Sequence, residues 1–205
     1  AAALGWTCTR LVLWAARRLG RPVRWISERR ESFLSDDHGR DVHIDAELAL
    51  DADGRMLALR SRFDVNIGCY LSGRSLFMVG NSGGIAGVYR IPAIAGQIRG
   101  IFTNTQTSAP YRGAGRPEAT YTIERLIDIA AHDLGIDPYE LRRRNLVQPS
   151  AMPYDTGFTF TYDCGEFEGN MTGAAEIADR AGFEKRRAEA AKRGKLRGLG
   201  ISNPI

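Results

Sequence analysis

Residues 111–118 form the stretch best suited to chemistry, a turn with the sequence Tyr-Arg-Gly-Ala-Gly-Arg-Pro-Glu that runs directly into a predicted helix. Gly113 and Gly115 allow the backbone to adopt positive φ angles and to approach a ligand closely. The proline suits the first position of a helix, because its missing N–H would have no partner there. The other N–H groups of the helix start, with Arg112 and Arg116 beside them, predict an anion-binding turn. The pattern alone leaves open a surface turn with solvated arginines.

The same turn begins like a dinucleotide-binding fingerprint but does not complete it. Glu118 stands at the sixth position, where glycine is needed for close packing of helix on strand. An arginine–proline pair inside the motif also disagrees with the usual geometry, and no phosphate-loop lysine follows. A standard Rossmann nucleotide site is therefore not expected.

Histidines and cysteines do not gather at the spacings that metal sites need. The histidines are His38, His43 and His132, and the cysteines are Cys8, Cys69 and Cys164. Because no cysteines are closely paired, neither a zinc site nor a disulfide framework is indicated, and a reducing cytoplasm is the simplest compartment. We expect no metal ligand from this chain and interpret the histidines as solvated or cap-like residues.

The elements after the turn predict how it is held. Residues 117–134 form the clearest amphipathic helix, in which Ile123 belongs to an apolar stripe and Glu124 lies off that stripe. Asp137 then predicts the N-cap of a second helix that runs to about Leu146. The two helices are expected to pack together behind the turn.

The elements before the turn predict a sheet. Alternating apolar and polar residues indicate a long β-hairpin made by residues 42–50 and 56–67, with one packed face. The segment 68–89 is rich in glycine and is expected to be partly irregular, with a short helix near residues 76–79. A strand at residues 94–104 then leads into the turn.

Shorter elements complete the chain. The predicted ones are a helix at 6–19, a strand at 23–26, a helix with its N-cap at Ser27 that ends at Leu34, a polar loop at 35–40, a strand at 158–162, helices at 167–181 and 183–193, and a final strand beginning at 197–201. Hairpins and helix pairs alternate here without regular βαβ units, so the predicted fold class is α+β.

The composition is that of an ordinary globular chain, with 205 residues, 43% of them hydrophobic, and a formal net charge of +4. The charge permits an anionic partner without requiring one. No apolar run approaches the roughly 20 residues that span a bilayer, so no membrane association is expected. Residues 185–197 are rich in lysine and arginine but poor in aromatic residues, which favours a solvated helix face over a nucleic-acid surface.

Six stretches of the chain carry the residue pattern of one enzyme family. They are residues 21–25 with Glu28-Arg29, 87–92, 102–105, 109–119, 134–138 and 141–145. In these stretches the chain resembles the large, molybdenum-binding subunit of the molybdenum hydroxylases, the xanthine dehydrogenase and aldehyde oxidase family, and particularly its carbon-monoxide-dehydrogenase-like branch. The resemblance covers nearly the whole chain, and the Tyr-Arg-Gly loop is its most specific part.

The resemblance implies that residues 1–205 are a partial molybdopterin-binding domain, truncated at both ends. The implied fold is an α+β internal portion of that domain, with a long β-hairpin, a mixed sheet and packed helices. The full subunit would hydroxylate an aldehyde, a heterocycle or a similar small molecule with water-derived oxygen. The implied cofactor is a molybdenum–molybdopterin cytosine dinucleotide, with iron–sulfur clusters and FAD on partner subunits of a cytoplasmic hetero-oligomer.

The resemblance also assigns roles within the turn. The residues expected to bind the cofactor are Tyr111, Arg112, Gly113, Gly115 and Arg116, and those expected at the catalytic position are Arg112, Gly113 and Ala114. Carbon monoxide dehydrogenases of this family place a copper-carrying cysteine where this chain has Gly113, which argues against carbon monoxide as the substrate. The small side chain of Ala114 is expected to leave room near the metal for an aldehyde or a heterocycle.

Other parts of the family pattern have no match in these residues. They are a Gly-Gly-Phe-Gly segment expected just before residue 1, a glutamine that reaches the molybdenum, and a general-base glutamate expected well beyond residue 205. The isolated segment is therefore expected to be inactive. The alternative from another class is a nucleotide- or nucleic-acid-binding module that uses the Arg112 and Arg116 loop and the basic C-terminal helix.

Overall fold

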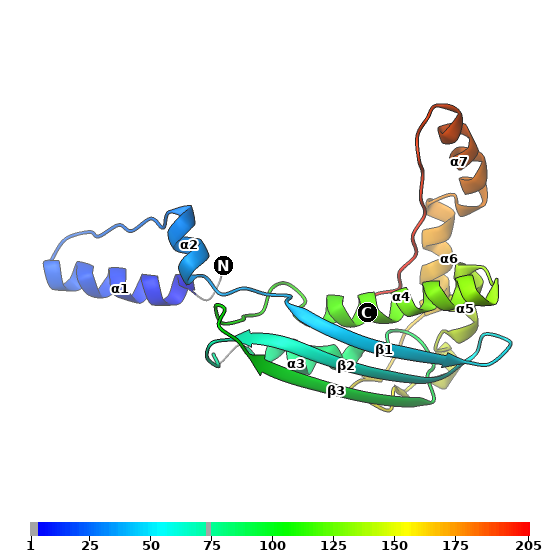
Figure 1. The fold of residues 1–205 in the computed structure, drawn as a ribbon, viewed down its shortest axis with the longest axis horizontal. Coiled ribbons are helices and arrows are strands. Elements are labelled where there is room, and N and C mark those ends of the chain that lie inside the picture. The colour runs from blue at the N-terminus through cyan, green and yellow to red at the C-terminus, as the bar shows by residue number, and fades with distance from the viewer. Residues whose placement is uncertain (1–3, 73–74) are drawn as a thin grey trace. The chain divides into compact units, whose positions relative to one another are not determined.

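The computed structural model of the protein describes residues 4–72 and 75–205, so Gly73 of the glycine-rich segment lies outside the described residues. Its main elements are α1 (Leu4–Leu19), α2 (Arg29–Ser35), β1 (Val42–Leu50), β2 (Met56–Gly68), α3 (Phe77–Asn81), β3 (Ala93–Phe102), α4 (Arg116–Leu134), α5 (Pro138–Asn145), β4 (Tyr154–Asp155), β5 (Thr161–Tyr162), α6 (Phe167–Ile177) and α7 (Phe183–Lys192). All of them except β4 and β5 are labelled in Figure 1. Short 3₁₀ turns are η1 (Ser82–Gly84), η2 (Pro149–Ala151) and η3 (Arg180–Gly182).

The chain divides into two compact units. Unit 1 contains the residues up to Ile44, together with Phe63–Ser82 and Ile98–Gly115. Unit 2 contains Asp45–Arg62, Gly83–Gln97 and Arg116–Ile205. The predicted turn therefore belongs to unit 1 as far as Gly115, and α4 begins unit 2 at the next residue.

The three long strands form one sheet in the order β1-β2-β3. Ion pairs between the strands give their directions. Asp45 pairs with Arg62 and Glu47 with Arg60, so β1 and β2 run antiparallel as a hairpin. Arg99 pairs with Asp64, and the N–H of residue 103 donates to the carbonyl of residue 68, so β2 and β3 run parallel. The arrowheads in Figure 1 show the same directions, which confirms the predicted mixed sheet and the α+β class.

The hairpin has the predicted packed face. Along β1, every second residue from Val42 to Leu50 is half-buried, and the residues between them, His43 included, are exposed. Along β2, Leu59 and Val65 are among the buried residues, and their neighbours on the opposite face are exposed or half-buried. A strict alternation of this kind fixes the register of a hairpin, because a slip of one residue would expose every apolar side chain.

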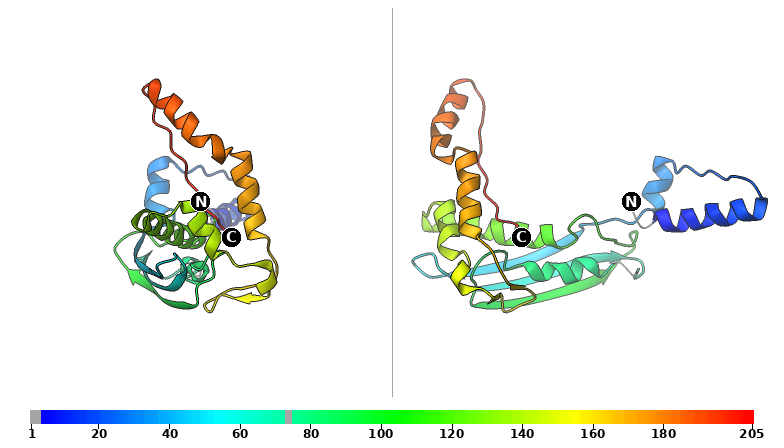
Figure 2. Two further views of the ribbon diagram at one scale, coloured as in Figure 1. Left: turned by 90° about the vertical axis from the view of Figure 1, so that its right-hand side faces the viewer. Right: turned by 180° about the vertical axis from the view of Figure 1, so that it is seen from behind.

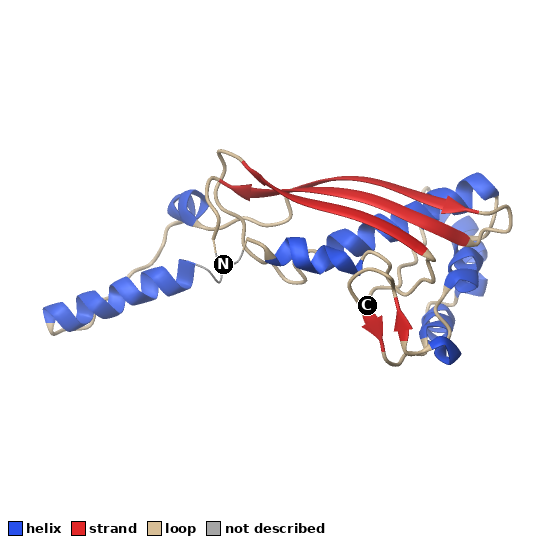
Figure 3. Ribbon diagram, turned by 90° about the horizontal axis from the view of Figure 1, so that it is seen from below, coloured by secondary structure: helices blue, strands red, loops and turns tan. Residues whose placement is uncertain are grey.

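In unit 2, the helices α4 and α5 follow the prediction closely. The buried residues of α4, which is drawn blue with the other helices in Figure 3, include Ile123 and Ile127 of the predicted stripe. Asp137 is the N-cap of α5, where its carboxylate accepts hydrogen bonds from the N–H groups of Tyr139 at 2.9 Å and Glu140 at 3.1 Å. The cap satisfies two donors that the helix leaves without an internal partner.

Two predicted strands are wrong. Residues 23–26 have no strand partner, and Trp25 and Ile26 are exposed. Residues 197–201 also form no strand. The predicted strand at 158–162 shrinks to β5, which pairs with β4. Extended propensity makes a strand only when a neighbouring strand supplies the ladder of hydrogen bonds.

The start of α2 also differs from the prediction. Its N-cap is Glu28, not Ser27, so the helix begins one residue later. The shift places Glu31 at the third helical position, where its carboxylate accepts a hydrogen bond from the Glu28 backbone N–H at 3.4 Å. A capping box is therefore present, although the sequence pattern centred on Ser27 did not indicate one.

The last part of unit 2 is a helical extension. After α7, the chain runs back alongside α6 toward α4, as both views in Figure 2 show. Asn203 joins the two regions, because its backbone N–H donates to Glu124 Oε1 at 3.0 Å. None of the helices described is long and apolar enough to cross a membrane.

Candidate functional site

The turn at residues 111–115 has an unusual backbone. Gly113, Ala114 and Gly115 follow one another with φ angles of 91°, 28° and 98°. The Ala114 N–H donates to the Tyr111 carbonyl at 2.9 Å, which closes the turn. Positive φ is favourable for glycine but strained for alanine, so the surrounding structure must hold this conformation in place.

Gly115 lies in tight contact with the end of α3. A Cβ atom at Gly115 would lie 2.4 Å from the carbonyl oxygen of Met78 and 2.9 Å from the backbone N of Ser82. The sequence suggested that this glycine lets the turn approach a ligand. In the structure it lets the turn approach the backbone of its own chain, and its approach to a ligand stays a prediction. Only glycine fits this contact, because both neighbouring atoms belong to the main chain.

Arg40 holds the other side of the turn. Its Nη2 donates to the carbonyl oxygen of Tyr111 at 3.2 Å and also to that of Arg112. Its guanidinium carbon lies 5.0 Å from the centroid of the Tyr111 ring, in a cation–π contact. The sequence pattern predicts only a polar loop at residues 35–40 and gives no role to Arg40. The one available signal was a charged residue after a glycine, which is too common to indicate a site.

The predicted site residues of unit 1 differ in exposure. Tyr111, Arg112 and Gly113 are exposed, and Ala114 and Gly115 are buried. The exposed three can therefore contact a ligand directly. The buried two act by shaping the backbone, so the methyl group of Ala114 does not line an open surface within the described residues.

Two buried polar atoms lie in the segments that flank the turn. Ser108 is 2% exposed, and its Oγ has no hydrogen-bond partner among the residues that the structure describes. Nε2 of His38 is also a buried atom without a hydrogen-bond partner among the described residues. His38 and Ser108 form a parallel bridge, and the N–H of Ala109 donates to the His38 carbonyl at 2.9 Å. Buried polar groups are normally paired, so these two atoms are exceptions among the described residues.

Arg116 lies in unit 2, at the first residue of α4. Its side chain is exposed, and its guanidinium carbon lies 5.9 Å from the centroid of the Phe160 ring. Pro117 follows within the first turn of the helix, as predicted. That Arg112 and Arg116 hold one anion together remains a prediction.

The histidines lie apart from any metal-binding constellation. Between residues 4 and 205, leaving aside 73 and 74, no group of three or more His, Cys, Asp or Glu side chains could hold a metal ion. His43 and His132 are exposed.

A buried polar cluster lies in unit 2, between α4 and α5. Arg142 is fully buried and donates to Glu124 Oε2 at 2.8 Å and to Asp128 Oδ1 at 2.9 Å. The Tyr89 hydroxyl donates to Glu124 Oε1 at 2.6 Å. Burial, followed by the charge of Glu124, raises the pKa of Tyr89 well above its ordinary value. Glu124 lies off the apolar stripe of the helix, as the sequence predicts, but it is nevertheless buried, because Arg142 supplies a buried cation.

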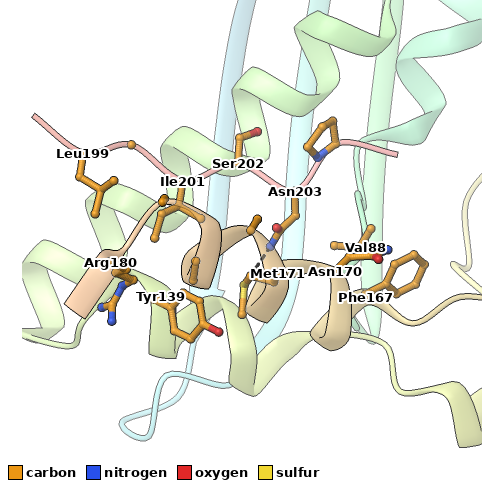
Figure 4. A pocket seen from close by; sticks show the side chains of 15 residues that line it. Val88, Tyr139, Phe167, Asn170, Met171, Arg180, Leu199, Ile201, Ser202 and Asn203 are labelled. Carbon is orange, nitrogen blue, oxygen red and sulfur yellow. Dashed lines mark hydrogen bonds between the residues drawn. The ribbon is translucent and has the colours of Figure 1, made fainter. Parts of the chain in front are cut away.

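A cavity of about 410 Å³ lies in unit 2 between α6 and the C-terminal segment. Figure 4 shows Phe167 and Met171 on one side of it and Ile201 and Asn203 on the other. The Asn203 side chain donates to the Tyr89 hydroxyl and to the Met171 sulfur, so it is already bonded within the fold. No residue of the predicted turn lines this cavity, and we assign it no chemistry.

Comparisons with known proteins agree on one family. The model of a molybdopterin cofactor-binding domain matches residues 4–146. The 6-hydroxypseudooxynicotine dehydrogenase complex subunit gamma of Paenarthrobacter nicotinovorans is 34% identical, over 92% of this chain and 25% of that protein. The carbon monoxide dehydrogenase large chain of Hydrogenophaga pseudoflava is 34% identical, over 85% of this chain and 22% of that protein.

A solved structure gives the same result. Quinoline 2-oxidoreductase from Pseudomonas putida 86 superposes with a TM-score of 0.80 and 38% identity, over 90% of this chain and 24% of that chain. The chain thus spans about a quarter of the length of the curated relatives it matches. The alternative of a nucleic-acid-binding module finds no support among these proteins.

Proposed function

Because the chain belongs to the family of molybdopterin cofactor-binding domains, we propose that it is part of the catalytic subunit of a molybdenum hydroxylase and that the turn at 111–116 lies beside the cofactor. The observation that carries this proposal is the geometry of the turn. Three successive positive φ angles shape the backbone of the turn, which is held by Arg40 and by the end of α3 and leaves Arg112 and Gly113 exposed. Such a turn is suited to binding an anion.

The residues present fit a molybdopterin cofactor. The backbone N–H groups of Arg112 and Gly113 donate no hydrogen bond to any residue that the structure describes. The Arg112 side chain is exposed and always charged. Donors of this kind suit a ligand rich in oxygen and carrying negative charge.

Each residue of the turn has a distinct task in this proposal. When bound, the cofactor would supply the two-electron oxidation by which a substrate carbon gains water-derived oxygen. Arg112 holds an anionic group of the cofactor or of the substrate, and Gly113 allows that group to approach the backbone. Tyr111 lies at the exposed edge of the turn, where its ring can contact a substrate. The proton acceptor for the reaction comes from outside these residues.

The proposed substrate class is an aldehyde, a heterocycle or a similar small molecule. The names of the relatives favour a nitrogen heterocycle within that class, because two of them concern a nicotine derivative and quinoline. Gly113 argues against carbon monoxide, for the reason given by the resemblance to the copper-containing members. We further propose the cytosine dinucleotide form of the cofactor, partner subunits that carry iron–sulfur clusters and FAD, and a cytoplasmic location.

The proposal is tested on the native polypeptide that contains this segment, captured from its source with an antibody to residues 183–193. We expect stoichiometric molybdenum by mass spectrometry and release of cytidine monophosphate by acid. We also expect reduction of an artificial dye with quinoline or nicotine as the substrate and none with carbon monoxide. A native polypeptide with neither molybdenum nor a released nucleotide would refute the enzymatic function. Release of a different nucleotide would refute only the proposed form of the cofactor.

A further inference from the structure

Arg40 binds two successive peptide groups of the turn. The same guanidinium nitrogen donates to the carbonyl oxygens of Tyr111 and Arg112. A guanidinium group offers donors in a rigid fork, so contact with two neighbouring oxygens restricts the rotation of both peptide planes. Stacking of Arg40 on the Tyr111 ring fixes the direction from which the guanidinium approaches.

These contacts set the direction of two N–H groups. In a trans peptide the carbonyl and the N–H point to opposite sides. The Tyr111 carbonyl shares its peptide with the Arg112 N–H, and the Arg112 carbonyl shares its peptide with the Gly113 N–H. A cation that holds both carbonyls therefore turns both N–H groups to the far side. Neither N–H donates to any of the described residues.

The charge of Arg40 also strengthens these donors. A cation beside a carbonyl oxygen polarises the whole peptide group, which makes its N–H a better hydrogen-bond donor. Successive N–H groups next to a residue of positive φ form a concave anion site, and Gly113 has a φ of 91°. The turn thus presents two polarised donors on the face opposite Arg40.

The backbone of Arg40 supports a specific role for its side chain. Its φ is 64°, in the left-handed region where an arginine is uncommon. Glycine or asparagine would adopt this conformation at a lower cost. The adjacent Gly39 also lies close to the turn, since a Cβ atom there would be 3.2 Å from the Cβ of Tyr111. The fold therefore brings this loop against the turn despite the strain.

We propose that Arg40 is a positioning residue that orients the backbone N–H groups of Arg112 and Gly113 toward an anionic oxygen or sulfur atom of the molybdopterin cofactor. This inference rests on the proposed function, because that function supplies the ligand. Arg40 itself lies on the carbonyl side of the two peptides, so it acts through the turn and does not touch the cofactor.

The test compares variants of the full native polypeptide, produced together with its partner subunits. Arg40→Gly removes the guanidinium and fits the left-handed backbone, so it separates the role of the side chain from backbone strain. Arg40→Lys keeps the positive charge but replaces the planar guanidinium, with its fixed N–H donors, by a flexible ammonium group. Arg60→Ala removes another exposed arginine, one whose partner is Glu47 on the neighbouring strand, and serves as the matched control.

The primary readout is the molybdenum and nucleotide content of each purified variant, with the unfolding temperature measured in parallel. We expect Arg40→Gly to lower cofactor occupancy by about tenfold or more, since donors to charged groups each contribute more than about 1.4 kcal/mol. Arg40→Lys should show an intermediate occupancy, and Arg60→Ala should match the wild type. Guanidinium chloride at low concentration during cofactor loading should partly restore the occupancy of Arg40→Gly.

The outcomes separate the two proposals. Wild-type occupancy in Arg40→Gly would overturn the inference, and so would a loss of occupancy that guanidinium does not restore, because that result would indicate a general folding effect. A wild-type polypeptide without molybdenum would instead overturn the proposed function itself. Because the wild type is measured first, failure of one proposal is distinguishable from failure of the other.

Discussion

Replacing Arg142 with methionine is expected to destabilise the packing of α4 and α5 by about 3–5 kcal/mol, because the Glu124 carboxylate is left buried without its cation. Burial lowers the pKa of the Arg142 guanidinium, but the neighbouring groups, Glu124 foremost, outweigh this effect and raise it, so the charge is retained. In the full native polypeptide, hydrogen–deuterium exchange at the backbone amides of α4 should accelerate by about two to four orders of magnitude.

The adjacent Arg143 provides the control. It is exposed and pairs with Glu140 at 2.9 Å and with Glu168 at 3.5 Å. Surface pairs of this kind contribute about 0–1 kcal/mol, so Arg143→Met should change the exchange rate by no more than about fivefold. Adding Glu124→Gln to Arg142→Met should recover part of the loss, since no buried charge then lacks a partner. Equal effects of Arg142→Met and Arg143→Met would contradict the assignment of a buried ion pair.

The second large effect is expected for Gly115→Ala, which should destabilise the turn by about 2–6 kcal/mol. A left-handed backbone costs alanine about 1–3 kcal/mol, and the overlap with the Met78 carbonyl adds about 1–3 kcal/mol. The turn must then move away from α3. Molybdenum occupancy of the full polypeptide should fall by about tenfold or more as the donors of the turn lose their positions.

Gly80→Ala is the matched control for this substitution. Gly80 lies in α3, its ideal Cβ has no atom within 4 Å, and its backbone is not left-handed. Alanine is favoured over glycine in a helix by about 1 kcal/mol, so this variant should keep full occupancy and gain slightly in unfolding temperature. Full occupancy in Gly115→Ala would show that the contact with α3 does not hold the turn.

The parts of the fold that the sequence predicts well are those specified by neighbouring residues. Asp137 caps α5 as expected, because an acidic residue before a proline signals a helix start within a few positions. The hairpin is also local, since an alternating pattern and a short turn specify it. Residues 23–26 have the composition of a strand, but no neighbouring strand pairs with them, and local sequence cannot reveal that.

The candidate site also has a part that the sequence predicts and a part that it does not. The glycines of the turn are visible in the sequence because their backbone requirement is local. Arg40 is not visible, because its contact with Tyr111 joins residues 71 positions apart. The burial of Glu124 is not visible in the sequence for a similar reason. Helical periodicity places it beside the apolar stripe, and only the fold shows that Arg142 from the next helix reaches it.

The long separation between Arg40 and Tyr111 has a consequence for the order of folding. The contact between Arg142 and Glu124 closes a segment of only 18 residues, against 71 for the Arg40 contact. The entropic cost of bringing the ends of a chain segment together grows with the logarithm of its length. The contact of Arg40 with the turn therefore costs roughly 1 kcal/mol more conformational free energy to form than the contact between Arg142 and Glu124. We therefore expect the helix pair to form first and the turn to become ordered last.

This order can be measured by pulsed hydrogen exchange during refolding of the full polypeptide. Amides of α4 should become protected before that of Ala114, whose N–H bond closes the turn; simultaneous protection would contradict the expected order. If the turn is ordered last, the polypeptide passes through a stage in which its helices are built and its anion site is still open. A large cofactor could be inserted at that stage without unfolding the rest of the chain.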